Sequence, residues 1–135
     1  EKIDCTQVSG KETSNVNTRS KMRKTYVIAR TQVEGIHRWD GCDISEVKYL
    51  TLDHRHMFHI HAQVEVVHHD RDVEFIQLGH KIKNYLTNKY WDNQYQVAMF
   101  NSMSCEMLAN ELIDEFDLYS CEVNEDGEGG AIVYA

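Results

Sequence analysis

The sequence predicts one small α+β domain with the element order ββααββ, in which a four-stranded antiparallel sheet carries two helices on one face. Three observations support this fold class. Two β-rich stretches come first, two amphipathic stretches with helical spacing follow, and a Gly-rich turn between two short β-rich runs closes the chain. The length of 135 residues suits a single hydrophobic core.

Residues 1–21 differ in composition from the rest of the chain. They are rich in Thr, Ser, Asn, Gln, Lys and Glu and contain few apolar side chains, so they can bury little surface. The first methionine is Met22. We therefore expect residues 1–21 to be a flexible arm, whether an expression remnant, a processed extension or a partner-binding segment. A single globular domain is expected over residues 22–135.

The first two predicted strands flank a long connection. Thr25–His37 is rich in β-branched side chains and loosely alternates, which favours a strand. Asp40–Asp53 contains Gly41 and mixed polar residues, which favours a connection. His56–His68 alternates as a half-buried strand does. Its apolar face carries Phe58, Ile60, Ala62, Val64 and Val66.

Helical spacing appears twice in the second half of the chain. Asp72 stands at an N-cap position with Glu74 in the first turn, and this helix is expected to end near Asn88. Its apolar face comprises Phe75, Leu78, Ile82, Tyr85 and Leu86. Ser104 is the expected cap of the second helix. The apolar residues of that helix are Met107, Leu108, Leu112, Ile113 and Phe116.

The chain is expected to end in a β-hairpin. Asp126–Gly130 is a turn-forming run that joins Cys121–Glu125 to Ala131–Tyr134. Four antiparallel strands leave two open sheet edges, and pairing those edges with neighbouring subunits would protect them. We therefore expect a cyclic homo-oligomer.

Charge and composition exclude several classes of partner. The chain has 14 Lys+Arg and 22 Asp+Glu, a net charge of −8, whereas nucleic-acid binders of this size usually carry a basic face. No apolar run approaches the roughly 18 residues of a membrane-spanning helix, and no secretory signal is visible. The four cysteines form no C-x-x-C pair. We expect no nucleic-acid or membrane partner and a reducing, cytoplasmic location.

Histidine spacing suggests a metal site. His54 and His56 form an H-x-H pair, and on a strand such a pair directs both imidazoles to one face. His37 ends the preceding strand, so hairpin pairing would bring it beside them. Three histidines with an open fourth position is an arrangement that zinc uses. The alternative is that histidines simply gather on an exposed strand face.

Five short segments occur in an order that is similar to one known family. They are Gly35–Trp39 (GIHRW), Asp53–Phe58 (DHRHMF), Arg71–Phe75 (RDVEF), Met103–Ala109 (MSCEMLA) and Val123–Glu125 (VNE). They resemble the A-A-H-R-L, L-H-G-H-N-Y, M-V-x-D-F, P-T-x-E-N-L-A and V-x-E segments of the tunnelling-fold family of 6-pyruvoyl-tetrahydropterin synthase and 6-carboxy-tetrahydropterin synthase. The resemblance extends from about Tyr26 to Tyr134.

The resemblance implies a tunnelling-fold architecture, a cyclic homo-oligomer and zinc at His37, His54 and His56. It also implies that Glu125 anchors the N–H edge of a pterin- or purine-like ring, because two adjacent ring donors match two carboxylate oxygens. Without the resemblance, Glu125 would be interpreted as a turn carboxylate. Glu106 is a candidate ligand-binding residue or a helix-dipole partner in the first turn of its helix.

Both proton-handling positions of the family are changed in this chain. Leu50 stands where the family has a cysteine four residues before H-x-H, and Asn93 stands where a histidine would move protons. Asparagine cannot act as a general acid or base near neutral pH. The remaining candidates for catalytic groups are Cys42, Glu46, Asp53 and Asp92.

Two functions follow from this pattern. The first is a zinc-containing protein that binds a pterin- or purine-like small molecule, nucleotides included, and sequesters it. The alternative is a divergent zinc-dependent synthase-like lyase that eliminates phosphate or cleaves a carbon–oxygen bond in a reduced pterin. A structural oligomer with surface histidines is a third, plainer interpretation, against which the placement of the three histidines and Glu125 argues.

Overall fold

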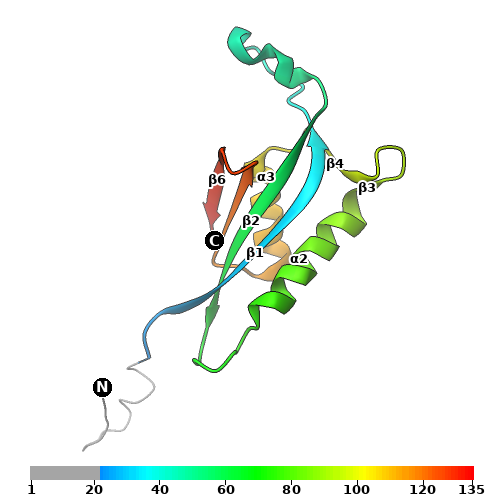
Figure 1. Ribbon diagram of the computed structural model, residues 1–135. Helices are drawn as coiled ribbons and strands as arrows, with labels where there is room; N and C mark the ends of the chain where they lie inside the picture. The colour runs from blue at the N-terminus through cyan, green and yellow to red at the C-terminus, as the bar shows by residue number, and fades with distance from the viewer. Residues whose placement is uncertain (1–21) are drawn as a thin grey trace, which may run out of the picture. The chain divides into compact units, whose positions relative to one another are not determined.

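A computed structural model describes residues 22–135 (Figure 1), so the predicted N-terminal arm lies outside the described residues. The described chain divides into two compact units. The larger unit, Tyr26–Glu65 and Val73–Ala135, contains both α-helices and almost all of the sheet. The smaller unit joins residues 22–25 to Val66–Asp72, and within it Thr25 Oγ1 lies 3.0 Å from His69 Nε2.

Two long strands form the centre of a six-stranded sheet with the order β3-β4-β1-β2-β5-β6. β1 (Thr25–His37) and β2 (His54–Val66) lie side by side and run in opposite directions (Figure 1). β2 pairs antiparallel with β5 (Ser120–Glu125), which pairs antiparallel with β6 (Gly129–Tyr134). The predicted first strand is therefore confirmed, and the predicted second strand begins and ends two residues earlier.

The other side of the sheet departs from the prediction of four antiparallel strands. The segment after the first helix forms β3 (Trp91–Asp92) and β4 (Val97–Asn101), where a connection was expected. β4 pairs parallel with β1, with Gly35 opposite Ala98. A run of five mostly buried residues is too short for periodicity to identify it as a strand. The α+β class is confirmed, but the strand number and the uniformly antiparallel pairing are wrong.

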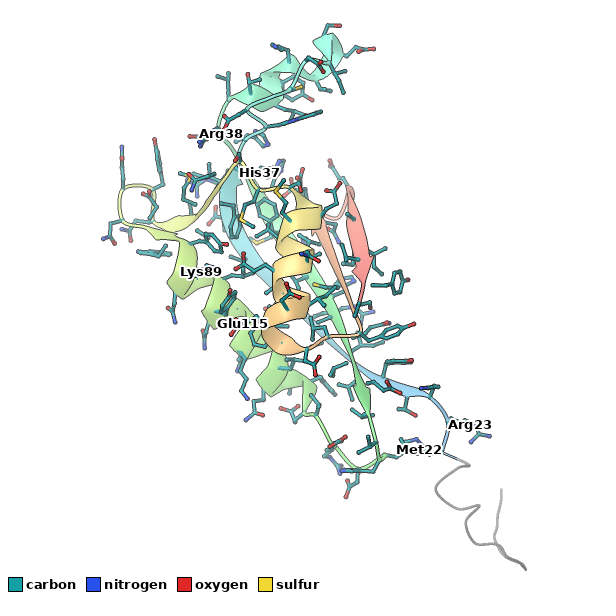
Figure 2. All side chains as sticks on the ribbon, turned by 180° about the vertical axis from the view of Figure 1, so that it is seen from behind. Met22, Arg23, His37, Arg38, Lys89 and Glu115 are labelled. Carbon is teal, nitrogen blue, oxygen red and sulfur yellow. The ribbon has the colours of Figure 1, made fainter. Side chains whose placement is uncertain are left out.

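Two α-helices cover one face of the sheet, as both views show (Figures 1 and 2). α2 spans Phe75–Tyr90 and α3 spans Cys105–Phe116. The side chains buried between helices and sheet include Phe58, Ile60, Ile82, Leu86, Phe100, Leu108 and Leu112. A third, 3-10 helix, η1 (Ser45–Thr51), lies within the predicted long connection. Within residues 22–135, no helix is long and apolar enough to span a membrane.

The helix caps are partly as predicted. Ser104 caps α3, and its hydroxyl accepts from Met107 N. The first cap is wrong by two residues: the Glu74 carboxylate accepts from the Ile76 and Gln77 amides, so α2 begins after Glu74. Asp72 instead accepts from Val67 N at 2.9 Å. Both carboxylates can cap a helix, and sequence spacing did not distinguish them.

Candidate metal and ligand site

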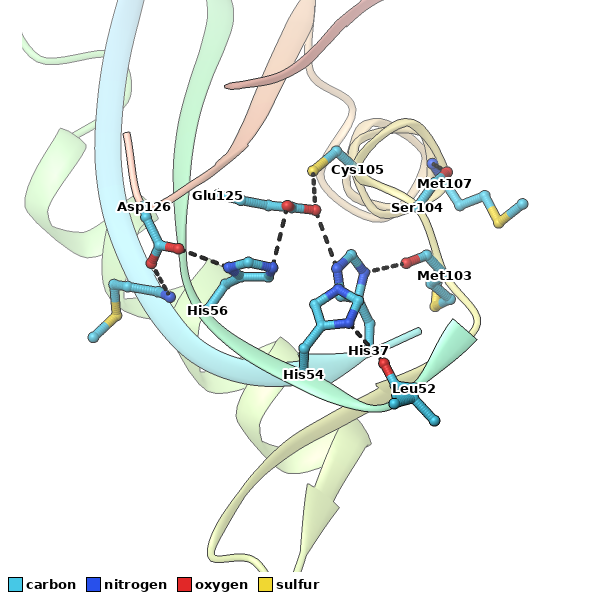
Figure 3. A network of polar contacts seen from close by, with 11 residues as sticks. His37, Leu52, His54, His56, Met103, Ser104, Cys105, Met107, Glu125 and Asp126 are labelled. Carbon is cyan, nitrogen blue, oxygen red and sulfur yellow. Dashed lines mark hydrogen bonds and ion pairs between the residues drawn. The ribbon is translucent and has the colours of Figure 1, made fainter. Parts of the chain in front are cut away.

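Three imidazoles lie close together at the end of β1 and the start of β2 (Figure 3). His37 is the last residue of β1, while His54 and His56 are the first and third residues of β2. Alternation places His54 and His56 on the helix-covered face, in line with buried Phe58. The ring centroids lie 4.6 to 5.4 Å apart, and one ligand atom from each histidine lies within 4.8 Å of the others. The expected convergence of the three histidines is confirmed.

Aromatic packing fixes the position of His37. Its ring packs edge-on against Phe58, which packs edge-on against Phe100, each at a centroid distance of 5.1 Å. Gly35 makes this close packing possible, since a Cβ at residue 35 would lie 2.4 Å from the Phe100 ring. The imidazole of His37 is therefore buried and backed by a rigid aromatic wall.

Each imidazole is oriented through its Nδ1 atom. The acceptors are Met103 O for His37 at 2.8 Å, Leu52 O for His54 at 2.7 Å and Asp126 Oδ2 for His56 at 2.6 Å. Carbonyl and carboxylate oxygens can only accept, so each Nδ1 donates its hydrogen. The Nε2 atoms are then left to bind something else. Metal-ligating histidines are held in this same way, by an oxygen acceptor on the other ring nitrogen.

Asp126 is the most firmly placed of these acceptors. Its Oδ1 accepts from Met57 N at 2.8 Å, and its own backbone N–H donates to Met57 O at 2.8 Å. Asp126 and Gly127 both have positive φ, as a tight hairpin turn after β5 requires. The Met57 amide, followed by His56, lowers the pKa of Asp126 and keeps it ionised. The sequence analysis identified Asp126 only as a turn residue.

Glu125 faces the Nε2 side of the cluster (Figure 3). Its Oε2 lies 3.1 Å from His37 Nε2, and its Oε1 lies 3.3 Å from His56 Nε2. The hydrogen bond with His37 lowers the pKa of Glu125 despite partial burial. Burial acts to lower the pKa of His37, but Glu125 and Met103 O outweigh it and raise that pKa. Carboxylate and imidazoles are thus electrostatically coupled.

His56 Nε2 is the buried side-chain polar atom without a hydrogen-bond partner among residues 22–135. Its 3.3 Å approach to Glu125 is close enough for charge attraction but does not form a hydrogen bond. An unpaired buried nitrogen costs free energy unless a further group binds it. Three imidazole nitrogens beside a carboxylate form a donor set that suits zinc. The residues therefore fit a bound metal ion.

A cavity of about 630 Å³ opens beside the cluster, a volume typical of small-molecule sites. Its lining includes Glu106, Glu125 and Trp39, whose side chain is 44% exposed. Arg38 is the only Lys or Arg in the lining that the structure describes, and it already contacts two carboxylates, Asp40 at 2.8 Å and Asp53 at 3.3 Å. The predicted ligand residues Glu125 and Glu106 therefore share one cavity.

Asp53, one of the four candidates for catalytic groups, pairs with Arg38 and does not line this cavity. The other three, Cys42, Glu46 and Asp92, also lie outside its lining. Cys42 is buried beneath η1, with its thiol 3.5 Å from Val47 O. Glu46 is exposed on η1. Asp92 accepts from the Gln94 and Tyr95 amides and so caps the turn between β3 and β4. The structure brings none of them to the histidines.

Cys105, like Asp126, is a site residue that the sequence did not indicate. It is the first residue of α3, it lines the cavity, and its Sγ lies 3.6 Å from Glu125 Oε2. Burial, together with the Glu125 charge, raises the pKa of this thiol to about 12, so it stays protonated at neutral pH. Cys105 lies inside the Met103–Ala109 segment of the resemblance, and that position was the only available signal.

Comparison with known proteins defines the fold alone. No protein-family profile matches this sequence, and no curated protein matches it. A similar fold is found in the crystal structure of an uncharacterized protein from Wolinella succinogenes, with a TM-score of 0.57. The two chains are 12% identical, and the similarity covers 84% of this chain and 99% of that one. The chain is therefore a mixed α+β protein.

Proposed function

We propose that this chain is a metal-containing protein of the tunnelling fold that binds a pterin- or purine-like small molecule, nucleotides included, beside its histidine cluster. One observation carries the proposal: all three Nδ1 atoms are held by oxygens, so that three Nε2 atoms remain for an ion at the cavity wall. Histidines that merely gather on an exposed strand face would not be expected to form the same Nδ1 hydrogen bond in all three cases.

His37, His54 and His56 are the residues that would hold zinc. When bound, zinc supplies a Lewis acid that polarises an oxygen of the bound molecule. Met103 O, Leu52 O and Asp126 keep the imidazoles in the ligating tautomer.

Ligand recognition is assigned to acidic and aromatic groups of the cavity. Glu125 can accept two hydrogen bonds from adjacent ring N–H groups, and Glu106 offers a second carboxylate at the cavity. Trp39 provides an exposed indole face for a planar ring. A flat molecule rich in N–H donors matches these groups.

Binding without turnover is the better-supported activity. Cys42, Glu46 and Asp92 are outside the cavity lining, and Asn93 Oδ1 accepts from Trp91 Nε1 on the β3 side of the sheet. The protein would then hold its ligand and sequester it. The three described cysteines are free thiols, which agrees with the reducing, cytoplasmic location that we propose.

A divergent zinc-dependent lyase is the second candidate, and Cys105 is the observation that favours it. Its thiol lies in the cavity lining beside Glu125, where it could exchange a proton with a bound molecule. The test is incubation of zinc-loaded protein with a reduced-pterin triphosphate. Release of inorganic triphosphate that depends on Cys105 would establish the lyase, and its absence supports binding alone.

The decisive experiment measures metal content and co-purifying mass together. Protein purified without chelators should carry close to one zinc per chain, and the His54→Ala, His56→Ala double variant should carry almost none. Mass spectrometry of the denatured supernatant should reveal a pterin- or purine-like compound in the wild type. Equal zinc in both proteins would contradict the proposed site.

We also propose a cyclic homo-oligomer. β6 is an edge strand, and Ile132 and Tyr134 on it are exposed. An unprotected edge with apolar side chains favours pairing with another copy. Light scattering at micromolar concentration should give a multiple of the chain mass, and a monomeric mass would contradict this expectation.

A further inference from the structure

We infer that Glu125 is the fourth ligand of the metal ion held by His37, His54 and His56. A ring ligand that hydrogen-bonds to Glu125 would first have to displace this carboxylate from the metal. The inference rests on the proposed function and adds a regulatory step to it. Glu125 would close the metal site while the cavity is empty and release it when the ligand binds.

The hydrogens of two of the imidazoles are already used elsewhere. His37 and His56 each donate their Nδ1 hydrogen to an oxygen, so a neutral imidazole has only a lone pair at Nε2. Both Nε2 atoms nevertheless lie within 3.3 Å of Glu125 oxygens, which also carry only lone pairs. Among residues 22–135, the side chain that donates a hydrogen to this carboxylate while the imidazoles are neutral is the weak thiol of Cys105. An added proton or a shared cation removes the repulsion between these lone pairs, and a shared cation does so for both imidazoles at once.

The distances from Glu125 to two of the histidines resemble those between ligands of one metal ion. In a tetrahedral site with metal–nitrogen bonds of 2.0–2.1 Å, neighbouring ligand atoms lie about 3.3–3.4 Å apart. Glu125 Oε2 is 3.1 Å from His37 Nε2, and Oε1 is 3.3 Å from His56 Nε2. The carboxylate therefore stands, through one oxygen each, at about this separation from two of the three histidines, His37 and His56.

The strand pairing holds Glu125 in a fixed position. Glu125 pairs with Phe58 across β2 and β5. Phe58 is two residues from His56 on the same strand, so Glu125 and His56 lie on the same face of the sheet. Asp126, the next residue, is tied to Met57 by two backbone-mediated hydrogen bonds. The unpartnered and buried His56 Nε2 lies on this same side of the cluster. The strands thus hold carboxylate and imidazoles together without a bound ligand.

This arrangement defines the ligand by two demands. Adjacent N–H groups must compete with the metal for the Glu125 oxygens, and a separate oxygen of the ligand must occupy the position that Glu125 leaves. Molecules that meet only the first demand would leave the metal with an unfilled position. The class of ligand is therefore a planar ring with adjacent N–H donors and an oxygen on its substituent.

The experiment uses cobalt(II) as a probe of the full-length, metal-stripped protein. Cobalt is titrated into wild type, Glu125→Gln, Glu125→Asp and Glu128→Gln, and both the affinity and the visible absorption spectrum are recorded. Glu128 lines the same cavity, so its variant removes an equal charge and serves as the matched control.

Glu125→Gln should weaken cobalt binding by about tenfold or more and alter the visible spectrum as water replaces a carboxylate. Glu125→Asp, which keeps the charge on a shorter side chain, should be intermediate, and Glu128→Gln should match wild type. Unchanged affinity and spectrum in Glu125→Gln, with binding still lost in His54→Ala, would overturn this inference and leave the proposed function standing.

Two other outcomes are equally clear. An intense thiolate-to-cobalt band that is lost in Cys105→Ser would make Cys105 the fourth ligand and overturn the assignment to Glu125. Failure of folded wild-type protein to bind cobalt would overturn the proposed function itself. The contacts between Glu125 and the imidazoles would then be hydrogen bonds from protonated histidines.

Discussion

Two carboxylates, Glu111 and Glu125, each collect several polar partners, but the partners differ in kind. Glu111 on α3 accepts from Tyr85 Oη at 2.7 Å, Tyr90 Oη at 2.6 Å and Lys89 Nζ at 2.8 Å. These groups from α2, where Lys89 is labelled in Figure 2, carry hydrogens at neutral pH. Glu125 instead faces two imidazole nitrogens whose rings already donate their hydrogen elsewhere.

The Glu111 cluster has the features of a structural cluster, and the Glu125 cluster has those of the proposed ligand site. The Glu111 cluster satisfies itself and joins α2 to α3, so it needs nothing from solution. The Glu125 cluster is satisfied only when a proton or a cation is added. Polar groups that lack hydrogen-bond partners occur more often at functional sites than in clusters that only stabilise the fold.

The largest expected effect is the response of stability to zinc. At a hundred times its dissociation constant, zinc should raise the free energy of unfolding of metal-free wild type by about 2.7 kcal/mol. Glu111→Gln should keep this increment, whereas His54→Ala should lose it. Thermal unfolding with and without zinc measures the difference, and an equal increment in His54→Ala would contradict the assignment of the two clusters.

Removal of the Glu111 carboxylate tests the structural cluster. Glu111→Ala should lower the free energy of unfolding by about 1–3 kcal/mol, because two half-buried hydroxyls lose their acceptor. Glu115→Ala is the matched control, since Glu115 is an exposed carboxylate on the same helix (Figure 2). Urea unfolding should place the control within about 0.5 kcal/mol of wild type. Similar losses of unfolding free energy in Glu111→Ala and Glu115→Ala would show that the Glu111 cluster does not stabilise the fold.

Asp126→Asn tests orientation at the ligand site. The amide keeps the shape of the side chain but accepts the His56 hydrogen less strongly, so zinc affinity should fall by about tenfold to a hundredfold. Competition with a chromogenic chelator measures the affinity. Unaltered affinity would mean that His56 does not depend on Asp126 for its tautomer.

The smallest effect concerns alkaline pH. Burial, followed by the Glu111 charge, raises the pKa of Tyr90 from 10.0 to about 12. The neutral phenol is favoured in the fold, so its contribution to stability is complete below pH 10 and is lost as the pH rises from 10 towards 12. Tyr90→Phe should lose less stability than wild type over this interval. Ultraviolet titration should show that wild type has one more tyrosine ionising near pH 12 than Tyr90→Phe has.

The sequence predicted most of the central strands and both helices because long, regular patterns determine them. The alternation of β2 and the Ser104 cap of α3 are local signals that tertiary packing did not override. β3 and β4 were missed because β4 is a short apolar run and its parallel pairing with β1 is non-local. Phe75 was predicted in the apolar face of α2, yet it is 57% exposed near the start of that helix.

The candidate site was predictable only where spacing along one strand defines it. H-x-H at His54 and His56 is a local pattern, and His37 followed from hairpin geometry. Cys105 and Asp126 reach the site through α3 and the β5–β6 turn, so no spacing in the sequence indicates their proximity. The catalytic candidates Cys42, Glu46 and Asp92 were chosen by nearness in sequence to the histidines or by resemblance, and the fold directs them elsewhere.

The contacts that orient the imidazoles join distant parts of the chain. His37 and Met103 are 66 residues apart, and His56 and Asp126 are 70 residues apart. Contacts of such separation form late, after the entropy of closing the intervening loops has been lost. A nascent chain that lacks its final hairpin therefore has no Asp126 to prepare His56 for a metal. Under the proposed function, metal binding would therefore be a late event of folding, which would lower the unfolding rate and leave the folding rate almost unchanged.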